Sequence, residues 1–299
     1  MLFDTHCHLD AAEYDADREA VIARAQAAGV QGILIPAVDP ANFARVRELA
    51  HGIPGGAYAL GIHPMAVAHC QDDALVALRA AITENLDDPR FVAVGEIGLD
   101  FFDPEISTGE PLARQERFFD AQLQLAVEFD FPVLLHVRRA QDTILKYLRR
   151  RRVRGGIAHA FNGSSQQAEA FIGLGLALGI GGAMTYARAT RIRSLAGSLD
   201  LSSLVLETDG PDIPPAWLTG ERRNEPAELT GIAQSLAQLR GITLERIAAE
   251  TGATALRVVP RLAALWGQLQ KRESSGAPGA DPTIPGMPPE EVSYGHQRV

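Results

Sequence analysis

The chain has 299 residues, of which 46% are hydrophobic and 22% are charged, a composition typical of a soluble globular protein. Its formal net charge of -9 argues against a protein that coats nucleic acid through a basic surface, although metal ions and a few arginines could still neutralise phosphate locally. No apolar run approaches the roughly 18 residues of a membrane span, and no basic stretch followed by an apolar one opens the chain. We therefore expect a cytoplasmic protein in which both cysteines, Cys7 and Cys70, are reduced.

Short apolar runs with strand character alternate with helical patterns over the first two thirds of the chain. The predicted strands cover the run around Leu2 and residues 32–36, 57–62, 91–97, 132–137, 156–160, 176–180 and 203–208. The predicted helices between them cover residues 16–28, 41–50, 73–85, 113–129, 142–151, 166–172 and 190–199. Such an alternation with short connections implies a parallel sheet, and eight units favour closure into a TIM (β/α)8 barrel. An open doubly wound sheet is the alternative.

Two further helical patterns follow the last predicted strand. They cover residues 226–240, opened by a proline, and 243–268, with a threonine cap and a bend expected at Pro260. We therefore expect one barrel domain over residues 1–270. Residues 271–299 are rich in proline and glycine and poor in apolar residues, so we expect a disordered or loosely packed tail outside that domain.

The motif Asp4-Thr5-His6-Cys7-His8 directly follows the first predicted strand. Alternate side chains of a strand share a face, so His6 and His8 project together with Asp4 behind them, whereas Cys7 points the other way into the barrel wall. Two convergent imidazoles can hold a divalent cation of the zinc or manganese type. The alternative is a structural pair of histidines at a strand end, because two ligands do not complete a metal site.

Further metal-compatible side chains follow the C-terminal ends of other predicted strands. A single histidine at such a position is more often a structural group, but a closed barrel brings all the strand C-termini to one face. Several ionisable groups in one partly buried mouth need charge compensation, which metal ions supply. The side chains concerned are His6, His8, His63, Glu96, His136, His159 and Asp209.

This set of side chains exceeds what one tetrahedral ion needs, so two ions that share a bridging carboxylate are the natural arrangement. Two such ions can activate a bridging water near neutral pH and hold both oxygens of a displaced ester. This chemistry suits hydrolysis without a covalent enzyme intermediate.

Seven motifs in a fixed order give the chain a resemblance to a known family. The chain resembles the TatD-type metal-dependent hydrolases and deoxyribonucleases, a branch of the amidohydrolase-like barrels, over about residues 2–240. Within that family it is similar to a subgroup of uncharacterised bacterial metal-dependent hydrolases, judging by residues 181–186 and 209–212. The motifs are Phe3-Asp4-Thr5-His6-Cys7-His8-Leu9-Asp10, Gly61-Ile62-His63-Pro64, Gly95-Glu96-Ile97-Gly98-Leu99-Asp100, Leu135-His136-Val137-Arg138, His159-Ala160-Phe161-Asn162-Gly163, Glu207-Thr208-Asp209 and Arg223-Asn224-Glu225-Pro226.

The resemblance implies a site for two divalent cations, of zinc, manganese, magnesium or a similar metal. The first ion would be held by His6, His8, Glu96 and Asp209, and the second by Glu96, His136 and His159, with Glu96 as the bridge. Asp209 would also accept the proton of the attacking water, so the resemblance implies that Asp209 and Glu96 are the catalytic residues.

The resemblance also implies groups around the metal ligands. His63 and Arg138 would contact a substrate phosphate, and the alternative for Arg138 is an outward salt bridge after its strand. Asp4 and Glu207 each lie two positions before a ligand, on the same strand face, and would orient the imidazoles.

Two other features bear on nucleic-acid binding. The family's acidic motif is often followed by two tyrosines, but Phe101 and Phe102 stand here, so any hydroxyl contact to substrate at this point is lost. Six basic residues lie between Lys146 and Arg154. Because the loops from helix to strand emerge opposite the active site of a barrel, we interpret this cluster as a solvated helix end.

The sequence therefore predicts a metal-dependent hydrolase of ester bonds. Its leading substrate is DNA or a small phosphoester, cleaved in the manner of an exonuclease, with no membrane involvement and no protein partner that can be inferred. One alternative is a hydrolase of C–N, carboxylic ester or lactone bonds on the same metal pair, because a shared fold does not fix the substrate. Another is a non-enzymatic protein whose metals are structural.

Overall fold

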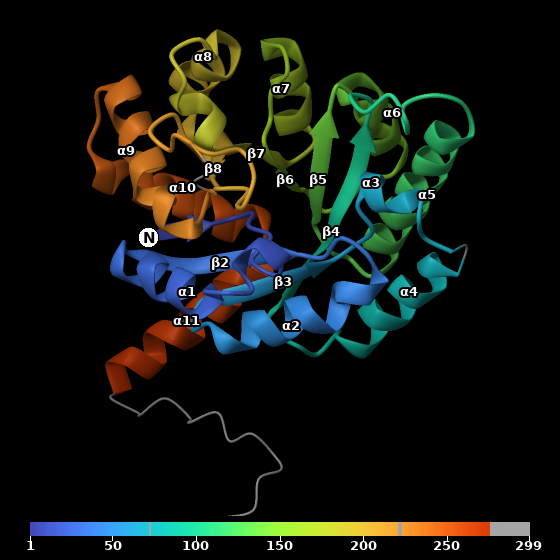
Figure 1. The fold of residues 1–299 in the computed structure, drawn as a ribbon, viewed down its shortest axis with the longest axis horizontal. Helices are drawn as coiled ribbons and strands as arrows, with labels where there is room; N and C mark the ends of the chain where they lie inside the picture. Colours follow the sequence, from blue (N-terminus) through green and yellow to red (C-terminus); the bar gives the residue numbers. More distant parts are fainter. Residues whose placement is uncertain (72, 221–222, 276–299) are drawn as a thin grey trace, which may run out of the picture.

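The computed structural model describes residues 1–71, 73–220 and 223–275, and it shows a (β/α)8 barrel (Figure 1). Eight parallel strands form one sheet in the order β1 to β8, and each strand pairs with the next one along the chain. The Thr5 N–H donates to the Leu206 carbonyl at 3.0 Å, which brings the two edge strands together. The predicted TIM barrel is confirmed.

The strands are short, and helices cover the outer face of the sheet. The strands are β1 Leu2–Asp4, β2 Val30–Pro36, β3 Gly56–Leu60, β4 Phe91–Asp100, β5 Val133–Arg138, β6 Gly156–Ala158, β7 Leu176–Ile180 and β8 Leu204–Leu206. The helices are α1 Arg18–Ala27, α2 Phe43–Gly52, α3 Pro64–Val67, α4 Ala74–Glu84, α5 Gly109–Glu128, α6 Gln141–Arg150, α7 Ser165–Gly173, α8 Thr190–Ser198, α9 Leu229–Arg240, α10 Leu244–Val258 and α11 Pro260–Ser275. Strand β4 extends beyond the predicted end at residue 97, and this extension becomes important at the site.

Two apolar clusters hold the barrel together. The larger one lies between the sheet and the surrounding helices, and the smaller one fills the barrel interior. In the smaller cluster, Leu34, Leu134 and other strand residues pack with Val259 and Leu262 from the junction of α10 and α11. This junction closes one end of the barrel with apolar side chains. A polar site is therefore expected at the opposite end of the barrel, where the C-terminal ends of the strands lie.

The predicted single bent helix over residues 243–268 is wrong, because the structure has two helices there. Helix α10 ends at Val258, and Val259 adopts φ -124° and ψ 78°, which is outside the helical region. Pro260 then occupies the first position of α11, where a missing backbone N–H costs nothing. Helix α11 continues to Ser275, past the predicted domain boundary at residue 270, and the rest of the predicted tail, 276–299, lies outside the described residues.

The basic cluster lies where it was predicted, at the end of α6 and in the loop that leads to β6. Arg151 forms two hydrogen bonds of 3.0 Å to the Asp120 carboxylate, and Arg154 pairs with Asp130. These arginines are engaged with neighbouring acidic residues on the outside of the barrel. Across the described ranges, no helix combines the length and hydropathy that crossing a membrane requires.

Candidate metal centre

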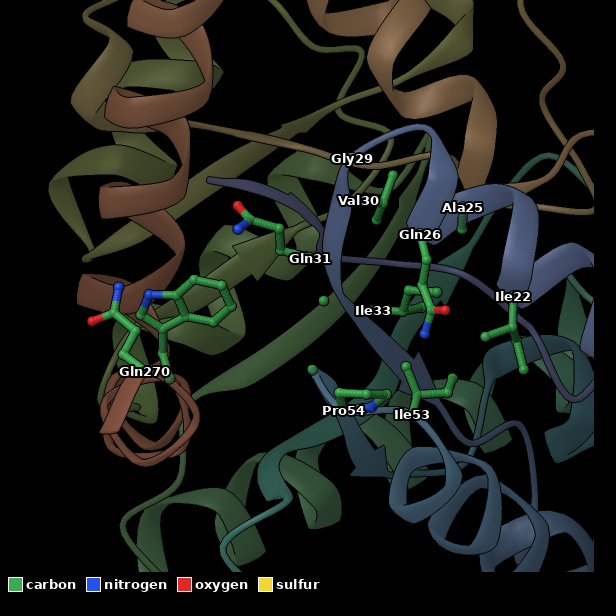
Figure 2. A pocket seen from close by; sticks show the side chains of 13 residues that line it. Ile22, Ala25, Gln26, Gly29, Val30, Gln31, Ile33, Ile53, Pro54 and Gln270 are labelled. Atoms are coloured by element: carbon green, nitrogen blue, oxygen red, sulfur yellow. The ribbon is translucent and has the colours of Figure 1, made fainter. Parts of the chain in front are cut away.

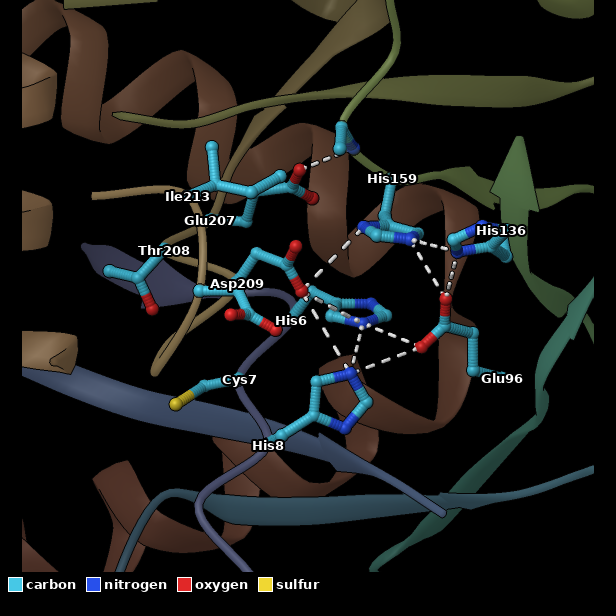
Figure 3. A network of polar contacts seen from close by, with 12 residues as sticks. His6, Cys7, His8, Glu96, His136, His159, Glu207, Thr208, Asp209 and Ile213 are labelled. Atoms are coloured by element: carbon cyan, nitrogen blue, oxygen red, sulfur yellow. Dashed lines mark hydrogen bonds and ion pairs between the residues drawn. The ribbon is translucent and has the colours of Figure 1, made fainter. Parts of the chain in front are cut away.

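The structure brings the six predicted metal ligands together at the C-terminal ends of the strands (Figure 3). His6 and His8 follow β1, Glu96 lies in β4, His136 in β5, and His159 and Asp209 follow β6 and β8. The strands that carry these positions are buried along almost their whole length, as is typical of a parallel barrel. Cys7 points away from the histidines, is fully buried and directs its Sγ to the Gly210 carbonyl at 3.5 Å, as predicted for a non-ligand.

Glu96 lies at the centre of the ring of imidazoles, and its two oxygens divide them into two groups. Its Oε2 lies 3.0 Å from His6 Nε2 and 3.2 Å from His8 Nε2. Its Oε1 lies 2.9 Å from His136 Nδ1 and 2.8 Å from His159 Nε2. His63 Nε2 also lies 3.2 Å from Oε1. A carboxylate with imidazoles on each of its two oxygens has the arrangement that a bridge between two ions requires.

Asp209 lies at the edge of the same ring and farther from the imidazoles. Its Oδ1 is 3.6 Å from His6 Nε2 and 3.9 Å from both His8 Nε2 and His159 Nδ1. Asp209 has φ 57°, a left-handed conformation that only surrounding contacts make tolerable. Its backbone N–H donates to the His6 carbonyl at 2.8 Å, so the first and last strands fix this carboxylate together.

The loop after Asp209 is tied down by the last of the family motifs. The buried Asn224 side chain donates to the carbonyls of Thr208 at 2.7 Å and Asp212 at 2.8 Å. Arg223 forms hydrogen bonds to both carboxylate oxygens of Asp17, which packs this segment against the start of α1. The motif Arg223-Asn224-Glu225-Pro226 therefore holds the backbone that carries Asp209 and contributes no ligand.

His63, predicted to contact the substrate phosphate, lies among the candidate metal ligands. Its Nε2 lies 3.2 Å from Glu96 Oε1 and 3.0 Å from His136 Nδ1, so it joins one of the groups that could hold an ion. Its Nδ1 accepts a hydrogen bond from the Met65 N–H at 3.2 Å, and burial lowers its pKa to about 4. A neutral ring that accepts at Nδ1 carries its proton on Nε2, so His63 presents an N–H donor to the site.

Arg138 lies in the lining of the cavity above the ligands, with its side chain half exposed. The alternative for Arg138 was a salt bridge directed away from the site. The structure instead places Arg138 Nη1 3.7 Å from Oδ2 of the buried Asp100, which lies at the site. The guanidinium therefore remains beside the site, where it can reach a phosphate.

Asp4 and Glu207 support the histidines differently from the prediction. Asp4 Oδ1 accepts from the backbone N–H of His6 at 3.3 Å and of Thr208 at 3.0 Å, and not from a ring nitrogen. Glu207 Oε1 accepts from the backbone N–H of Ala160 at 2.5 Å, next to His159. Both carboxylates are fully buried and hold the backbone that carries a ligand.

Asp100 is the site residue that the sequence analysis missed. Its Oδ2 lies 3.1 Å from His136 Nε2, the ring nitrogen opposite the one that faces Glu96. Burial would raise the pKa of Asp100, but hydrogen bonds from His136 and from the Phe102 N–H outweigh it and lower the pKa to about 2. An ionised carboxylate behind an imidazole fixes the ring and strengthens it as a ligand. The available signal was strand parity, because Asp100 lies four positions after Glu96 on β4.

Replacing Asp100 with asparagine is expected to lower metal affinity and hydrolytic activity by about 10- to 100-fold, because the His136 ring loses its charged partner. Titration of the metal-free protein with Zn²⁺ or Mn²⁺, followed by turnover assays, measures both quantities. Asp103→Asn is the matched control, because the Asp103 side chain accepts from the Glu105 N–H and only its unchanged backbone N–H contacts Asp100. Equal metal affinity in the Asp100 and Asp103 variants would contradict the assigned role.

The charges in the ring fit a divalent metal. Burial lowers the pKa of imidazoles, but for His8 and His159 the carboxylates of Glu96 and Asp209 outweigh burial and raise the pKa to about 9 and about 10. The chain alone thus needs protons on these rings to balance its buried carboxylates. Ring nitrogens also face each other at 3.3 Å, as in His6 Nε2 and His8 Nε2. A divalent cation between these rings would replace the protons as the source of positive charge. The nitrogens and oxygens that face each other here are the ligand atoms that such ions bind.

The metal centre lies at the base of a large cavity. The cavity has a volume of about 1180 Å³, and its rim carries the side chains of Met65, Phe102, Arg138, Arg139 and Arg191. A second hollow, of about 320 Å³, lies near the starts of β2 and β3, at the opposite end of the barrel (Figure 2). Among the described residues, its lining holds no ionisable side chain that could supply acid, base or metal chemistry.

Comparisons with known proteins agree with this site. The family model described as TatD related DNase matches residues 3–259. The uncharacterised metal-dependent hydrolase YjjV of Escherichia coli K12 is 41% identical over 248 residues, which cover 82% of this chain and 92% of the relative. The 3'-5' ssDNA/RNA exonuclease TatD of Escherichia fergusonii is 34% identical over 256 residues, which cover 84% of this chain and 95% of the relative.

The crystal structure of YjjV from E. coli K12, a TatD homologue, superposes with a TM-score of 0.81 at 39% identity and covers 87% of this chain and 98% of that one. A TatD-family hydrolase from Entamoeba histolytica shares the fold with a TM-score of 0.75 at 20% identity. The matches run through all eight strands, and the metal-ligand candidates lie within them. The chain therefore belongs to the TatD family and is a divalent-metal-dependent hydrolase of ester bonds.

Proposed function

We propose that the protein is a phosphodiesterase with two divalent ions that removes nucleotides from an end of single-stranded DNA. The observation that carries this proposal is the position of Glu96, whose two oxygens each contact a different group of imidazoles at the base of a cavity with an arginine-bearing rim. The relatives named as ssDNA/RNA exonucleases support the choice of a nucleic acid as substrate.

The ligands divide between the two ions in the way the contacts suggest. His6, His8, Glu96 and Asp209 would hold one ion, and Glu96, His136 and His159 would hold the other. Imidazole and carboxylate donors suit Zn²⁺, Mn²⁺ and similar metals. When bound, the ions polarise the phosphoryl group and lower the pKa of an attacking water.

The chain's own side chains then bind the phosphodiester and move the proton. Asp209, at the edge of the ring, accepts the proton of the attacking water. The His63 Nε2–H and the Arg138 guanidinium donate hydrogen bonds to the phosphate oxygens, where negative charge builds up in the transition state. No nucleophilic side chain is needed, so the reaction proceeds without a covalent intermediate.

Two free cysteines, Cys7 and Cys70, support a reducing compartment such as the cytoplasm.

A substrate panel with defined metals tests the proposal. Protein stripped with a chelator is reloaded with Mg²⁺, Mn²⁺ or Zn²⁺ and assayed with end-labelled single-stranded oligonucleotides, bis(4-nitrophenyl) phosphate, amides and lactones. We expect metal-dependent cleavage of both phosphodiesters and stepwise shortening of the oligonucleotide. Turnover of amides or lactones without phosphodiester cleavage would favour the C–N and carboxylic ester alternative. A large loss of thermal stability on chelation with no turnover of any substrate would make the metals structural.

A further inference from the structure

An exposed aromatic ring lies at the rim of the active-site cavity. Phe101 packs against the barrel core, but Phe102 is 46% exposed and lines the cavity together with Glu96 and His136. Scattered exposed apolar residues are common and carry no meaning by themselves. Phe102 differs from Val127, an equally exposed apolar residue on α5, because it lies within the cavity lining and has charged partners.

Two arginines hold their guanidinium groups against this ring. The guanidinium carbon lies 3.9 Å from the Phe102 ring centroid for Arg138 and 4.5 Å for Arg139. Consecutive residues of a regular strand point to opposite faces, so two neighbours would not normally reach one ring. Arg139 has φ 58°, and this left-handed turn at the end of β5 lets both guanidinium groups face Phe102.

The same group is fixed to the metal centre through Asp100. The Phe102 N–H donates to Asp100 Oδ1 at 2.7 Å, and Arg138 Nη1 lies 3.7 Å from Asp100 Oδ2. That Oδ2 also contacts His136 Nε2 at 3.1 Å. The ring and the guanidinium groups are therefore linked through Asp100 to a predicted metal ligand, His136.

The charge of this group suits a polyanion. Within the described part of the chain, Arg139 forms no ion pair, and Arg138 has only the longer contact with Asp100. Arg191 lines the same cavity. In a chain with a formal net charge of -9, cations that remain half exposed at the mouth are available to phosphate groups.

We propose that Phe102, Arg138 and Arg139 form a subsite for the nucleotide next to the scissile phosphate. The base stacks on the ring and guanidinium planes, and Arg139 contacts the flanking phosphate, while Arg138 keeps its contact with the scissile phosphate. Both kinds of plane are stacking surfaces for unpaired bases, and a base within a duplex could not reach them. This inference rests on the proposed function and extends it, because it assigns Phe102 and Arg139 to recognition of a single strand.

The test compares a normal oligonucleotide with one that lacks the base at the terminal position. Phe102→Ala is expected to raise KM for the normal oligonucleotide by about tenfold or more and to raise KM for the abasic one far less, because only the base stacks. Phe102→Tyr should restore the wild-type KM, because tyrosine keeps the stacking plane. Arg139→Gln should weaken binding of both oligonucleotides. It should also reduce the slope of log K against log salt concentration by about one, because one phosphate contact is lost. Val127→Ala, on an exposed apolar residue outside the cavity, is the matched control and should match the wild type.

Binding is measured separately by fluorescence anisotropy in an Asp209→Asn background, so that it does not depend on turnover. Equal effects of Phe102→Ala on the normal and abasic oligonucleotides, or no effect on either, would overturn the stacking subsite. Failure of the wild type to cleave any phosphodiester would overturn the proposed function instead, and the anisotropy data would still decide whether the subsite binds a single strand.

Discussion

Replacing Glu96 with glutamine is expected to release at least one metal ion and to reduce phosphodiester hydrolysis by more than about a hundredfold. The amide loses the negative charge shared by five imidazoles, and its NH2 group must face a ring nitrogen on one side. Removal of one partner from a buried charged network typically costs about 3–5 kcal/mol. Metal content per chain, measured by elemental analysis after gel filtration, and initial rates with bis(4-nitrophenyl) phosphate measure the two effects.

The control for this change is Glu110→Gln, an exposed glutamate in the first turn of α5 that pairs with Arg117. This variant should retain wild-type metal content and activity. Circular dichroism of both variants establishes that the barrel is intact. A Glu96 variant that keeps both ions and its activity would show that Glu96 does not bridge the two ions.

The positions of the candidate ligands could be predicted because each lies in the C-terminal part of an apolar strand or directly after it. In a parallel barrel the strand C-termini converge, so the spacing of His6 and His8, and the single positions of His136 and Asp209, locate the site without any distance being known. The same argument predicts which way Cys7 points, because parity along a strand is a local property. These predictions needed only the strand pattern and its closure.

The contacts between strands could not be predicted in this way. The pairing of Asp100 with His136 depends on the register between β4 and β5, in which Asp100 lies opposite Arg138, and no local pattern determines that register. The role of His63 depends on the hydrogen bond from the Met65 N–H, which sets the position of its proton. The left-handed conformation of Arg139 could likewise not be predicted, because the residue is not a glycine.

The proposed proton acceptor, Asp209, depends both on the strand pattern and on contacts between strands. Asp209 is predicted as a ligand by its place after β8, but its longer distances to the imidazoles separate it from Glu96. A carboxylate that is held less closely by its neighbours keeps an oxygen free to receive a proton. This difference leads to a test that separates the two carboxylates.

Replacing Asp209 with asparagine is expected to lower kcat by about 10²- to 10⁴-fold, the usual contribution of a general base, with a much smaller change in metal content than Glu96→Gln produces. The asparagine oxygen can still face the metal, but the side chain can no longer accept a proton. We expect the backbone at this position to stay in place, because the N–H of residue 209 keeps its hydrogen bond to the His6 carbonyl. Single-turnover rates with a saturating oligonucleotide, together with metal content, measure the effect.

The matched control is Asp212→Asn, which changes a carboxylate in the same cavity lining and the same loop. This variant is expected to keep a kcat close to that of the wild type. That result would exclude a general effect of lost negative charge at the mouth of the cavity. A kcat in the Asp209 variant equal to that of the wild type would assign the proton to another residue. A parallel loss of metal and activity would instead make Asp209 a ligand without a role in proton transfer.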